Sequence, residues 1–323
     1  MELAVDRRGF VCGGVILAAG RAWAADPYPS RPVRWVVPYP AGAFTDAAAR
    51  VIGKRLGERL GQQFVIDNRT GAGSNIGTEI VANAPADGHT LLFISTANVI
   101  NTSLYKILPF DFRRDIVPVA GLVRMPQLIV VNPAVPAATT AEFIAYCKAN
   151  PGRVNMASAG IGTGNHLAGE IFQSMTGTKL THVPYRGTAP AMADLIAGQV
   201  QVIFDNVATS IEHVRAGKIR AIATTTLTRL PVLPDVPPVA ETVPGYEAIS
   251  FYGVGAPTGT PWEIVDKLNR EINLAMADRE IERFFVGLGT IIAIGSPTDF
   301  GRLMDAEGAK WAAAVKTSGA TLE

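Results

Sequence analysis

Short apolar runs alternate with segments of helical periodicity along most of the chain. Val33 to Val37 reads as a strand, and apolar residues at three- and four-residue spacing then predict an amphipathic helix over 48–60. The unit returns with a strand at 64–67 and a helix at 75–84, which ends before Pro85. Strands that alternate with helices indicate an α/β fold with a largely parallel sheet.

The same alternation continues into the second half of the chain. A strand at 90–94 leads into a polar loop over 95–98, and further apolar runs predict strands at 128–132, 154–158, 180–184, 201–205, 219–224 and 250–256. Thr139 with Glu142 three residues later is a capping-box pattern, which predicts a helix that opens at Phe143. This order predicts two similar α/β lobes that are joined by extended crossing strands.

The first 24 residues have the pattern of a secretion signal. A pair of arginines precedes an apolar stretch over 10–20, which is shorter than the roughly 20 residues that span a bilayer. The stretch ends in Ala22-Trp23-Ala24, the small-x-small pattern of a signal-peptidase site, so we expect cleavage near Ala24 and a periplasmic product. The arginine pair also resembles a twin-arginine signal, although Asp6 stands where Ser or Thr is usual, and both export routes stay open.

Composition and charge narrow the class of partner. The chain has 323 residues, of which 48% are hydrophobic, with 29 basic and 28 acidic side chains. Its length suggests about two domains of roughly 100–200 residues each. The near-neutral charge argues against a nucleic-acid partner or a polybasic membrane surface. Removal of residues 1–24 leaves one thiol, Cys147, which we place in the core as a small hydrophobic residue.

Little in the chain points to catalysis or to a metal. The 4 histidines are too scattered for a metal pair at helical spacing, and 2 cysteines cannot form a four-thiolate site. Ser158 follows a predicted strand, but Met156 and Gly160 do not complete a nucleophile elbow. The glycine-rich stretch 71–77 departs from the dinucleotide fingerprint in its third glycine. We expect no enzyme, no metal and no cofactor, with a secreted hydrolase or lyase as the alternative.

The loops after the strands share small residues and helix starts. Free backbone N–H groups at a helix start attract anions, by about 0.3–1 kcal/mol each. In the loop 40–46 we expect Ala43 and Phe44 to expose their amides and Thr45 to contact the ligand. Asp46 is negative and would repel an anion, so we assign it to organising the loop. Capping of the first helix by Thr45 or Asp46 is the alternative.

Several motifs follow one another in a fixed order along almost the whole mature chain. They are Tyr28 to Pro40, Gly42 with Thr45-Asp46, Asn68-Arg69 with Gly71 to Gly77, Ala84 to Gly88, Gly160 to Thr163 with His166-Leu167, Val183 to Gly187, Gly198 to Val200 with Phe204-Asp205, and Ala256 to Pro261. Together they resemble the periplasmic solute-binding receptors of the tripartite tricarboxylate transporter family, also called Bug receptors.

The resemblance implies a bilobal fold like that of type II periplasmic binding proteins, with two α/β domains around a ligand cleft. It implies a first lobe over 25–122 and 253–323 and a second lobe over 123–252. The implied function is an extracytoplasmic receptor that captures a small organic acid, aromatic or di/tricarboxylic, for separate membrane transporter subunits. A ligand-sensing receptor for a membrane kinase would use the same clamp, so that alternative stays open. We expect a monomer.

Carried over by position, the resemblance implies ligand contacts from both lobes. The first lobe supplies Tyr39, Ala43, Phe44, Thr45, Ser74, Asn75, Ser95, Thr96 and Ala97, and the second supplies Ser158, Gly162, Thr163, His166 and Asp205. Arg186 lies in a motif that we expect to brace the cleft, so we leave it out of the site. Phe44 stands where the family often has a small residue, and we hypothesise that it narrows the cleft or stacks on an aromatic acid.

Overall fold

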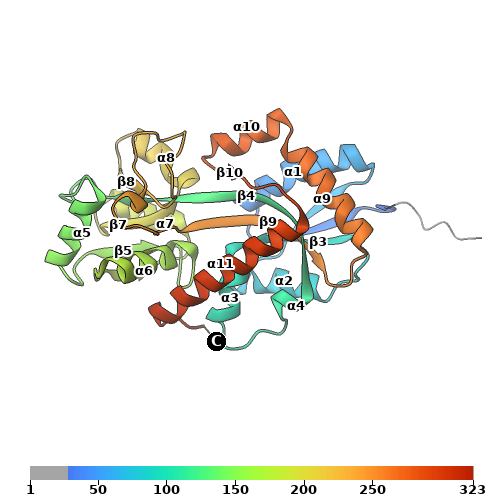
Figure 1. Cartoon of the computed structure of the whole chain (residues 1–323), viewed down its shortest axis with the longest axis horizontal. Coiled ribbons are helices and arrows are strands. Elements are labelled where there is room, and N and C mark those ends of the chain that lie inside the picture. The colour runs from blue at the N-terminus through green and yellow to red at the C-terminus, as the bar shows by residue number, and fades with distance from the viewer. Residues whose placement is uncertain (1–27, 323) are drawn as a thin grey trace, which may run out of the picture.

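The protein has two lobes that lie side by side along its longest axis (Figure 1). The structure is a computed structural model, and it describes residues 28–322. The expected signal peptide and its cleavage site lie outside the described residues. None of the helices described is long and apolar enough to cross a membrane.

Lobe 1 is built from parallel strands with helices between them. Its strands pair in the order β2-β1-β3, with β1 parallel to both neighbours. The elements are β1 (Val33–Val37), α1 (Phe44–Leu60), β2 (Phe64–Asn68), α2 (Asn75–Ala82), β3 (Thr90–Ser95), α3 (Thr96–Leu104) and α4 (Phe112–Asp115). The predicted loop over 95–98 is wrong, because Ser95 and Asn98 form a capping box that opens α3.

Lobe 2 repeats this architecture with its own sheet. Its strands follow the order β4-β7-β5-β6, with β8 also paired to β4. The elements are α5 (Thr140–Ala149), β5 (Asn155–Ser158), α6 (Gly164–Thr176), β6 (Thr181–Pro184), α7 (Thr188–Ile196), β7 (Val202–Asn206), α8 (Val207–Arg215) and β8 (Arg220–Thr224). Helix α5 begins at Thr140, earlier than predicted, because Thr139 is its N-cap and accepts a hydrogen bond from the Glu142 amide.

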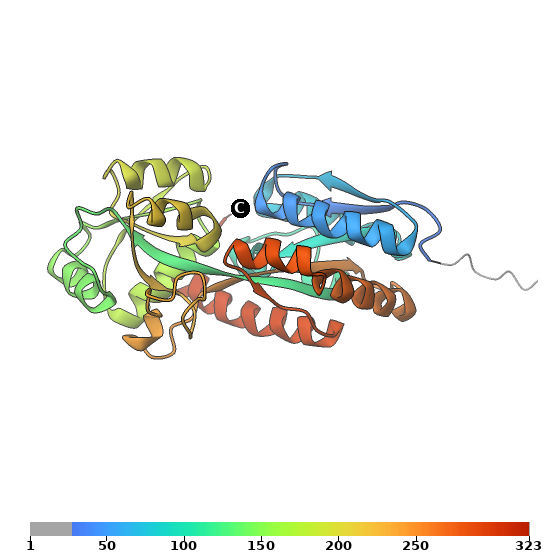
Figure 2. The same ribbon diagram turned by 90° about the horizontal axis from the view of Figure 1, so that it is seen from above.

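Two long strands connect the lobes. They are β4 (Ile116–Val131) and β9 (Ile249–Pro257), and Figure 2 shows β4 running from one lobe into the other. The first part of β4 pairs with β9, and its last residues pair with β7 and β8. The sequence predicted a strand over 128–132 only, and the sheet is mixed because β4 and β9 run antiparallel to their neighbours.

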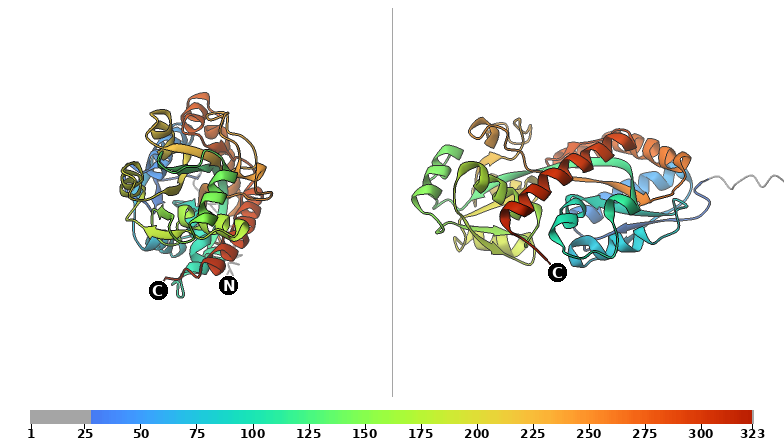
Figure 3. Two further views of the ribbon diagram at one scale, coloured as in Figure 1. Left: turned by 90° about the vertical axis from the view of Figure 1, so that its left-hand side faces the viewer. Right: turned by 60° about the horizontal axis from the view of Figure 1, so that its bottom comes forward.

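The chain ends with helices that return to lobe 1 and then bridge both lobes. These elements are α9 (Trp262–Met276), α10 (Arg279–Gly287), β10 (Ile291–Ile292) and α11 (Pro297–Ser318). Helix α11 packs on α3 of lobe 1 and on α6 of lobe 2, as Figure 3 shows. The lobe boundaries expected at 122/123 and 252/253 fall inside β4 and β9, and this division of the chain stays a prediction.

The hydrophobic core follows the lobes. One cluster under α1 and α9 includes the fully buried Trp35, and another in lobe 2 includes Leu195. A third runs from lobe 1 into lobe 2 and contains Phe172 and Trp311. Cys147 is fully buried in this third cluster, and burial raises the pKa of its thiol to about 12. The thiol is therefore a packing group.

Candidate functional site: the interlobe cleft

A cleft of about 370 Å³ lies between the lobes, within the size range of small-molecule sites. Helix starts and strand ends of both lobes line it, together with the crossing strands. Among the described residues, none that lines the cleft carries a charge. The lining consists of Pro38, Tyr39, Pro40, Thr70, Gly71, Gly73, Ser74, Ser95, Thr96, Ala97, Gln127, Ala159, Thr163, Gly164, Asn165, Asn206, Ser250 and Tyr252.

The wall from lobe 1 is a chain of hydrogen-bonded side chains. The Tyr39 hydroxyl and Ser95 Oγ are 2.6 Å apart, and burial raises the pKa of Tyr39. The Asn98 side chain accepts a hydrogen bond from the Ser95 amide and donates one to Thr78 Oγ1 at 2.8 Å. Thr78 in turn donates to the Ser74 carbonyl oxygen, 3.0 Å away. Three loops are thereby fixed to one another before any ligand arrives.

Ser74 occupies a strained position at the start of α2. Its φ of 87° lies in the left-handed region, which costs a residue with a side chain about 1–2 kcal/mol. Its buried hydroxyl has no hydrogen-bond partner in the described part of the chain. A polar atom in this state is one that water or a ligand satisfies. Asn75, by contrast, lies outside the lining, and its carboxamide oxygen accepts a hydrogen bond from Asn101.

Thr96 connects the lobe 1 wall to the crossing strands. Its hydroxyl accepts a hydrogen bond of 2.7 Å from the Phe251 amide on β9. Tyr252, which follows Phe251 on β9, lines the cleft. Its ring centroid is 5.0 Å from that of Phe44 and 6.0 Å from that of Phe93. The start of α3 is therefore tied directly to the cleft floor.

The wall from lobe 2 depends on a carboxylate that lies behind it. Asp205 is fully buried and accepts hydrogen bonds from the Thr209 and Ser210 hydroxyls, at 2.5 and 2.6 Å. It also accepts from Asn165 Nδ2, which donates to the Phe204 carbonyl as well. Burial raises the pKa of Asp205. The carboxylate thereby positions Asn165, which lines the cleft at the start of α6.

The loop before α6 rests on two stacked histidines. The rings of His166 and His182 are 3.8 Å apart between centroids. His166 Nδ1 accepts a hydrogen bond from the Gly162 amide, and His182 Nε2 is 2.7 Å from Ser158 Oγ. Burial, together with the nearby His166, lowers the pKa of His182 to about 4. The pair supports the loop from its buried side.

The predicted site residues divide into two groups. The cleft lining includes Tyr39, Ser74, Ser95, Thr96, Ala97 and Thr163. It does not include Ala43, Phe44, Thr45, Asn75, Ser158, Gly162, His166 or Asp205. Most of the second group are occupied with internal contacts, including the Ala43 amide, which donates to the Pro40 carbonyl oxygen instead of pointing to a ligand. Ligand contact by either group stays a prediction.

Phe44 lies behind the cleft floor. Its ring packs against Tyr252 and Phe285, with centroids 5.0 and 6.2 Å away. Phe44 thus supports Tyr252 in this arrangement, and its direct stacking on an aromatic acid stays a prediction. Thr45 is also buried, and its hydroxyl has no partner within residues 28–322.

Asp46 stabilises the loop over 40–46 through a backbone hydrogen bond and an ion pair. Its Oδ2 accepts a hydrogen bond from the Gly42 amide at 2.9 Å, and the carboxylate pairs with Arg50 one turn along α1. The hydrogen bond from Arg50 lowers the pKa of Asp46, and the Gly42 amide lowers it as well. The N-cap of α1 is Ala43, without a side-chain cap, so neither Thr45 nor Asp46 caps the helix.

Sequence reasoning missed several residues of the cleft. Gln127 and Ser250 interrupt apolar runs on the two crossing strands, and Asn206 directly follows a predicted strand. A polar residue inside an apolar strand was the available signal. The buried side-chain oxygens of Gln127 and Asn206 have no partner in the described residues, so they too are open to water or a ligand.

The Ser158–His182 pair is a nucleophile-and-base geometry that the sequence did not reveal. Ser158 is fully buried, however, and its hydroxyl also bonds to the Gly160 backbone. A substrate carbonyl cannot reach a hydroxyl in that position, and a base with its pKa lowered to about 4 is weak. The pair supports the loop.

Two α/β lobes around an uncharged polar cleft define a solute-binding protein. The chain belongs to the family described as tripartite tricarboxylate transporter family receptor, whose model matches residues 48–320. Members of this family are periplasmic receptors and not enzymes, so the hydrolase or lyase alternative has no support.

Similar proteins cover nearly the whole chain. BugT of Bordetella pertussis is 37% identical over 318 residues, which are 97% of this chain and 98% of that protein. A Rhodopseudomonas palustris protein with adipate has 39% identity and a TM-score of 0.82, covering 91% of this chain and 100% of the other. MatC from the same organism, with bound malate, has 31% identity and a TM-score of 0.78, with 89% and 100% covered.

Proposed function

We propose that this protein captures a small organic acid in the interlobe cleft and delivers it to the membrane subunits of a tripartite transporter. The observation that carries the proposal is a polar cleft whose lining has no charged side chain among the described residues. Such a site recognises a carboxylate through backbone amides, hydroxyls and carboxamides. Because the lining has no cationic side chain among the described residues, the ligand's carboxylate forms no ion pair with it.

Helix starts supply the positive potential that side chains do not. The first residues or N-caps of α2, α3, α6 and α8 line the cleft, two helices from each lobe. Each contributes about 0.3–1 kcal/mol to an anion at its end, and more in a partly buried site. Because these ends face one another across the cleft, a dicarboxylate can place one carboxylate on each lobe. The adipate and malate found with similar proteins support this ligand class.

Unpartnered buried atoms indicate how the rest of the ligand is held. The Ser74 hydroxyl and the side-chain oxygens of Gln127 and Asn206 have no partner among the described residues. Water that bridges these atoms to a carboxylate would satisfy them at a cost of about 0–2 kcal/mol of ordering entropy each. Recognition through water and amides suits a range of acids of similar length.

A thermal-shift screen followed by calorimetry tests the proposal. The panel contains adipate, malate, citrate and benzoate, with adipamide as an uncharged match for adipate. We expect a dicarboxylate to raise the melting temperature, since saturation at one hundred times Kd adds about 2.7 kcal/mol of stability. Adipamide should give no shift. Equal shifts with adipate and adipamide, or none with any acid, would contradict carboxylate capture.

The export and assembly of the protein are part of the same proposal. Support comes from the secretion pattern of residues 1–24 and from the family's periplasmic location. Mass spectrometry of the protein from the periplasm should find an N-terminus at Ala25, and light scattering should find a monomer. An N-terminus at Met1, or a dimer at micromolar concentration, would correct the respective point.

A further inference from the structure

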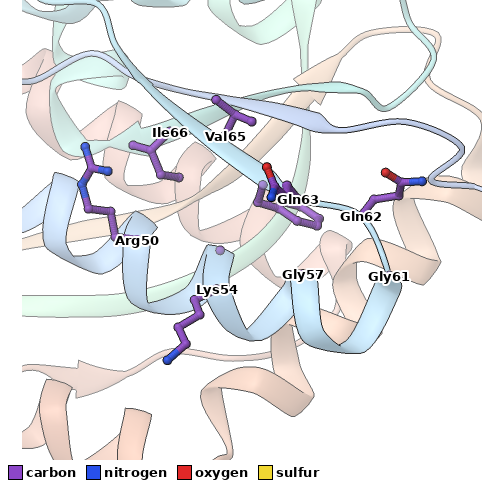
Figure 4. A pocket seen from close by; sticks show the side chains of 10 residues that line it. Arg50, Lys54, Gly57, Gly61, Gln62, Gln63, Val65 and Ile66 are labelled. Carbon is purple, nitrogen blue, oxygen red and sulfur yellow. The ribbon is translucent and has the colours of Figure 1, made fainter.

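The outer edge of the lobe 1 sheet carries a groove that is separate from the ligand cleft. Strand β2 is the last in the order β2-β1-β3, and within residues 28–322 its outer edge pairs with no strand. A cavity of about 680 Å³ lies along this edge, between β2 and α1 (Figure 4). No residue lines both this groove and the cleft. A contact made here leaves the ligand site open.

The backbone of β2 offers hydrogen-bonding groups at this edge. The Val33 amide donates to the Gln63 carbonyl, so Gln63 faces β1. In a parallel ladder, alternate residues face opposite sides, and Phe64 and Ile66 therefore direct their N–H and C=O groups outward. A row of unpaired groups of this kind is a template for one more strand.

The groove is open because α1 presents no side chains toward part of it. Gly53 and Gly57 line it, and neither has the left-handed φ that would require glycine. At Gly53 the helix packs closely on the strand, because a Cβ there would lie 3.3 Å from Phe64 Cβ. A Cβ at Gly57 would lie 3.4 Å from the Gln62 carbonyl oxygen, an ordinary contact. Val65 on the strand is 48% exposed. The resulting surface is a shallow apolar trough beside a free strand edge.

The rim of the groove is basic. Arg50 and Lys54 line it, and no acidic side chain does. Arg50 is paired with Asp46, and Asp67 on β2 is paired with Arg34 and Arg69, so the cation that the groove offers to a partner is Lys54. Lys54 makes no ion pair within the described residues. A second copy of this chain would bring the same basic rim against this one, so a partner with carboxylates fits better.

We propose that the outer edge of β2 accepts an extended acidic segment of a partner polypeptide as an added strand. Main-chain hydrogen bonds to Phe64 and Ile66 would hold the segment in register. An apolar side chain of the segment would lie over Gly57, and a carboxylate would meet Lys54. The inference goes beyond ligand capture, because it concerns a face that the ligand does not use.

Fluorescence polarisation with a labelled peptide tests this docking edge. The probe is a capped hexapeptide of alternating Glu and Val, and its match carries Lys in place of Glu. We expect saturable binding of the acidic peptide only. Gly57→Leu should abolish it by filling the trough, and Lys54→Glu should weaken it about five-fold, the effect of losing about 1 kcal/mol from one exposed ion pair. Val65→Glu, on an exposed position, should weaken it as well.

The controls separate docking from folding and from ligand capture. Gly287→Leu introduces leucine at a helical glycine with open space around it, and Lys148→Glu reverses an exposed lysine on lobe 2. Both should bind peptide like the wild type, and all variants should keep their adipate response. Equal binding of both peptides, no binding at millimolar peptide, or unchanged binding by Gly57→Leu would overturn the proposal. So would self-association that Gly57→Leu removes, because a second copy would then be the occupant.

Discussion

The two walls of the cleft reach the same uncharged surface by different routes. On lobe 1, Tyr39, Ser95 and Asn98 satisfy one another and rest on an aromatic layer. On lobe 2, Asn165 is held by Asp205, a buried carboxyl group that does not line the cleft. The first wall is stabilised by neutral hydrogen bonds and ring contacts, and the second by a desolvated carboxylate.

This difference shows where charge can be placed in an anion site. Asp46 lies below the lobe 1 loop with Arg50 as its partner, and Asp205 lies behind the lobe 2 wall with hydroxyl and amide donors. Asp205 organises Asn165, which lines the cleft, whereas Asp46 organises the loop that follows Pro40. Neither acid lines the cleft. A negative charge one layer back can orient donors toward an anion while those donors screen it.

The largest expected effect comes from the point where the walls touch. Gly162 has a φ of 74°, and a Cβ there would lie 2.1 Å from Leu104 Cδ2 on lobe 1. Gly162→Ala should weaken binding of the best acid about 10- to 100-fold by calorimetry, since overpacking at this contact costs about 1–3 kcal/mol. Leu104→Ala in the same chain should restore part of the loss. Full affinity in the single variant would show that this contact does not limit closure.

Removing the aromatic layer tests the lobe 1 wall. Phe44→Ala should lower the free energy of unfolding by about 2–3 kcal/mol, less than for a fully buried phenylalanine. If Phe44 only supports Tyr252, the affinities of Phe44→Ala for adipate and benzoate should fall by similar factors. Phe44→Leu should lose less affinity for both acids. A selective loss of benzoate binding would instead return Phe44 to direct contact with an aromatic acid.

Asp205→Asn tests the lobe 2 wall. It should destabilise the protein by about 2 kcal/mol, because an amide nitrogen replaces an acceptor among hydroxyl donors. Burial raises the folded pKa of Asp205, so wild-type stability falls as pH rises from about 4 through that pKa, whereas the variant lacks this loss. Urea denaturation from pH 4 to 7 should show that the difference in free energy of unfolding between the wild type and Asp205→Asn narrows as the pH rises. If this difference widened as the pH rises, the fold would stabilise Asp205 as an anion. Asp235→Asn, at an exposed site, is the control.

The smallest effect is expected at Thr45. The sequence predicted a ligand hydrogen bond there, worth roughly 1 kcal/mol of affinity. Its hydroxyl is buried outside the cleft lining and has no partner in the described residues. Thr45→Ala should therefore change calorimetric affinity less than about five-fold, with Thr45→Ser unchanged. A larger fall would place Thr45 against the ligand and extend the lobe 1 wall to the start of α1.

The sequence alone determined the elements and their order. Val33 to Val37 and the helix beginning at Asn75 lie where the sequence pattern predicted them, because that signal depends only on near neighbours along the chain. The small residues after each strand also indicated which loops carry the site. The length of β4 escaped this reasoning, since its pairing with β9 joins segments more than a hundred residues apart. Helix α3 escaped it as well, because it begins where a polar loop was predicted.

The tertiary structure decided which polar groups face the cleft. Ser95 and Ser158 both end a strand before a helix, yet Ser95 lines the cleft and Ser158 is buried against His182. Local sequence cannot separate them, because the difference lies in a partner 24 positions away. Burial and charge depend on what the other segments bring to the same place, and that is known only once the chain has folded.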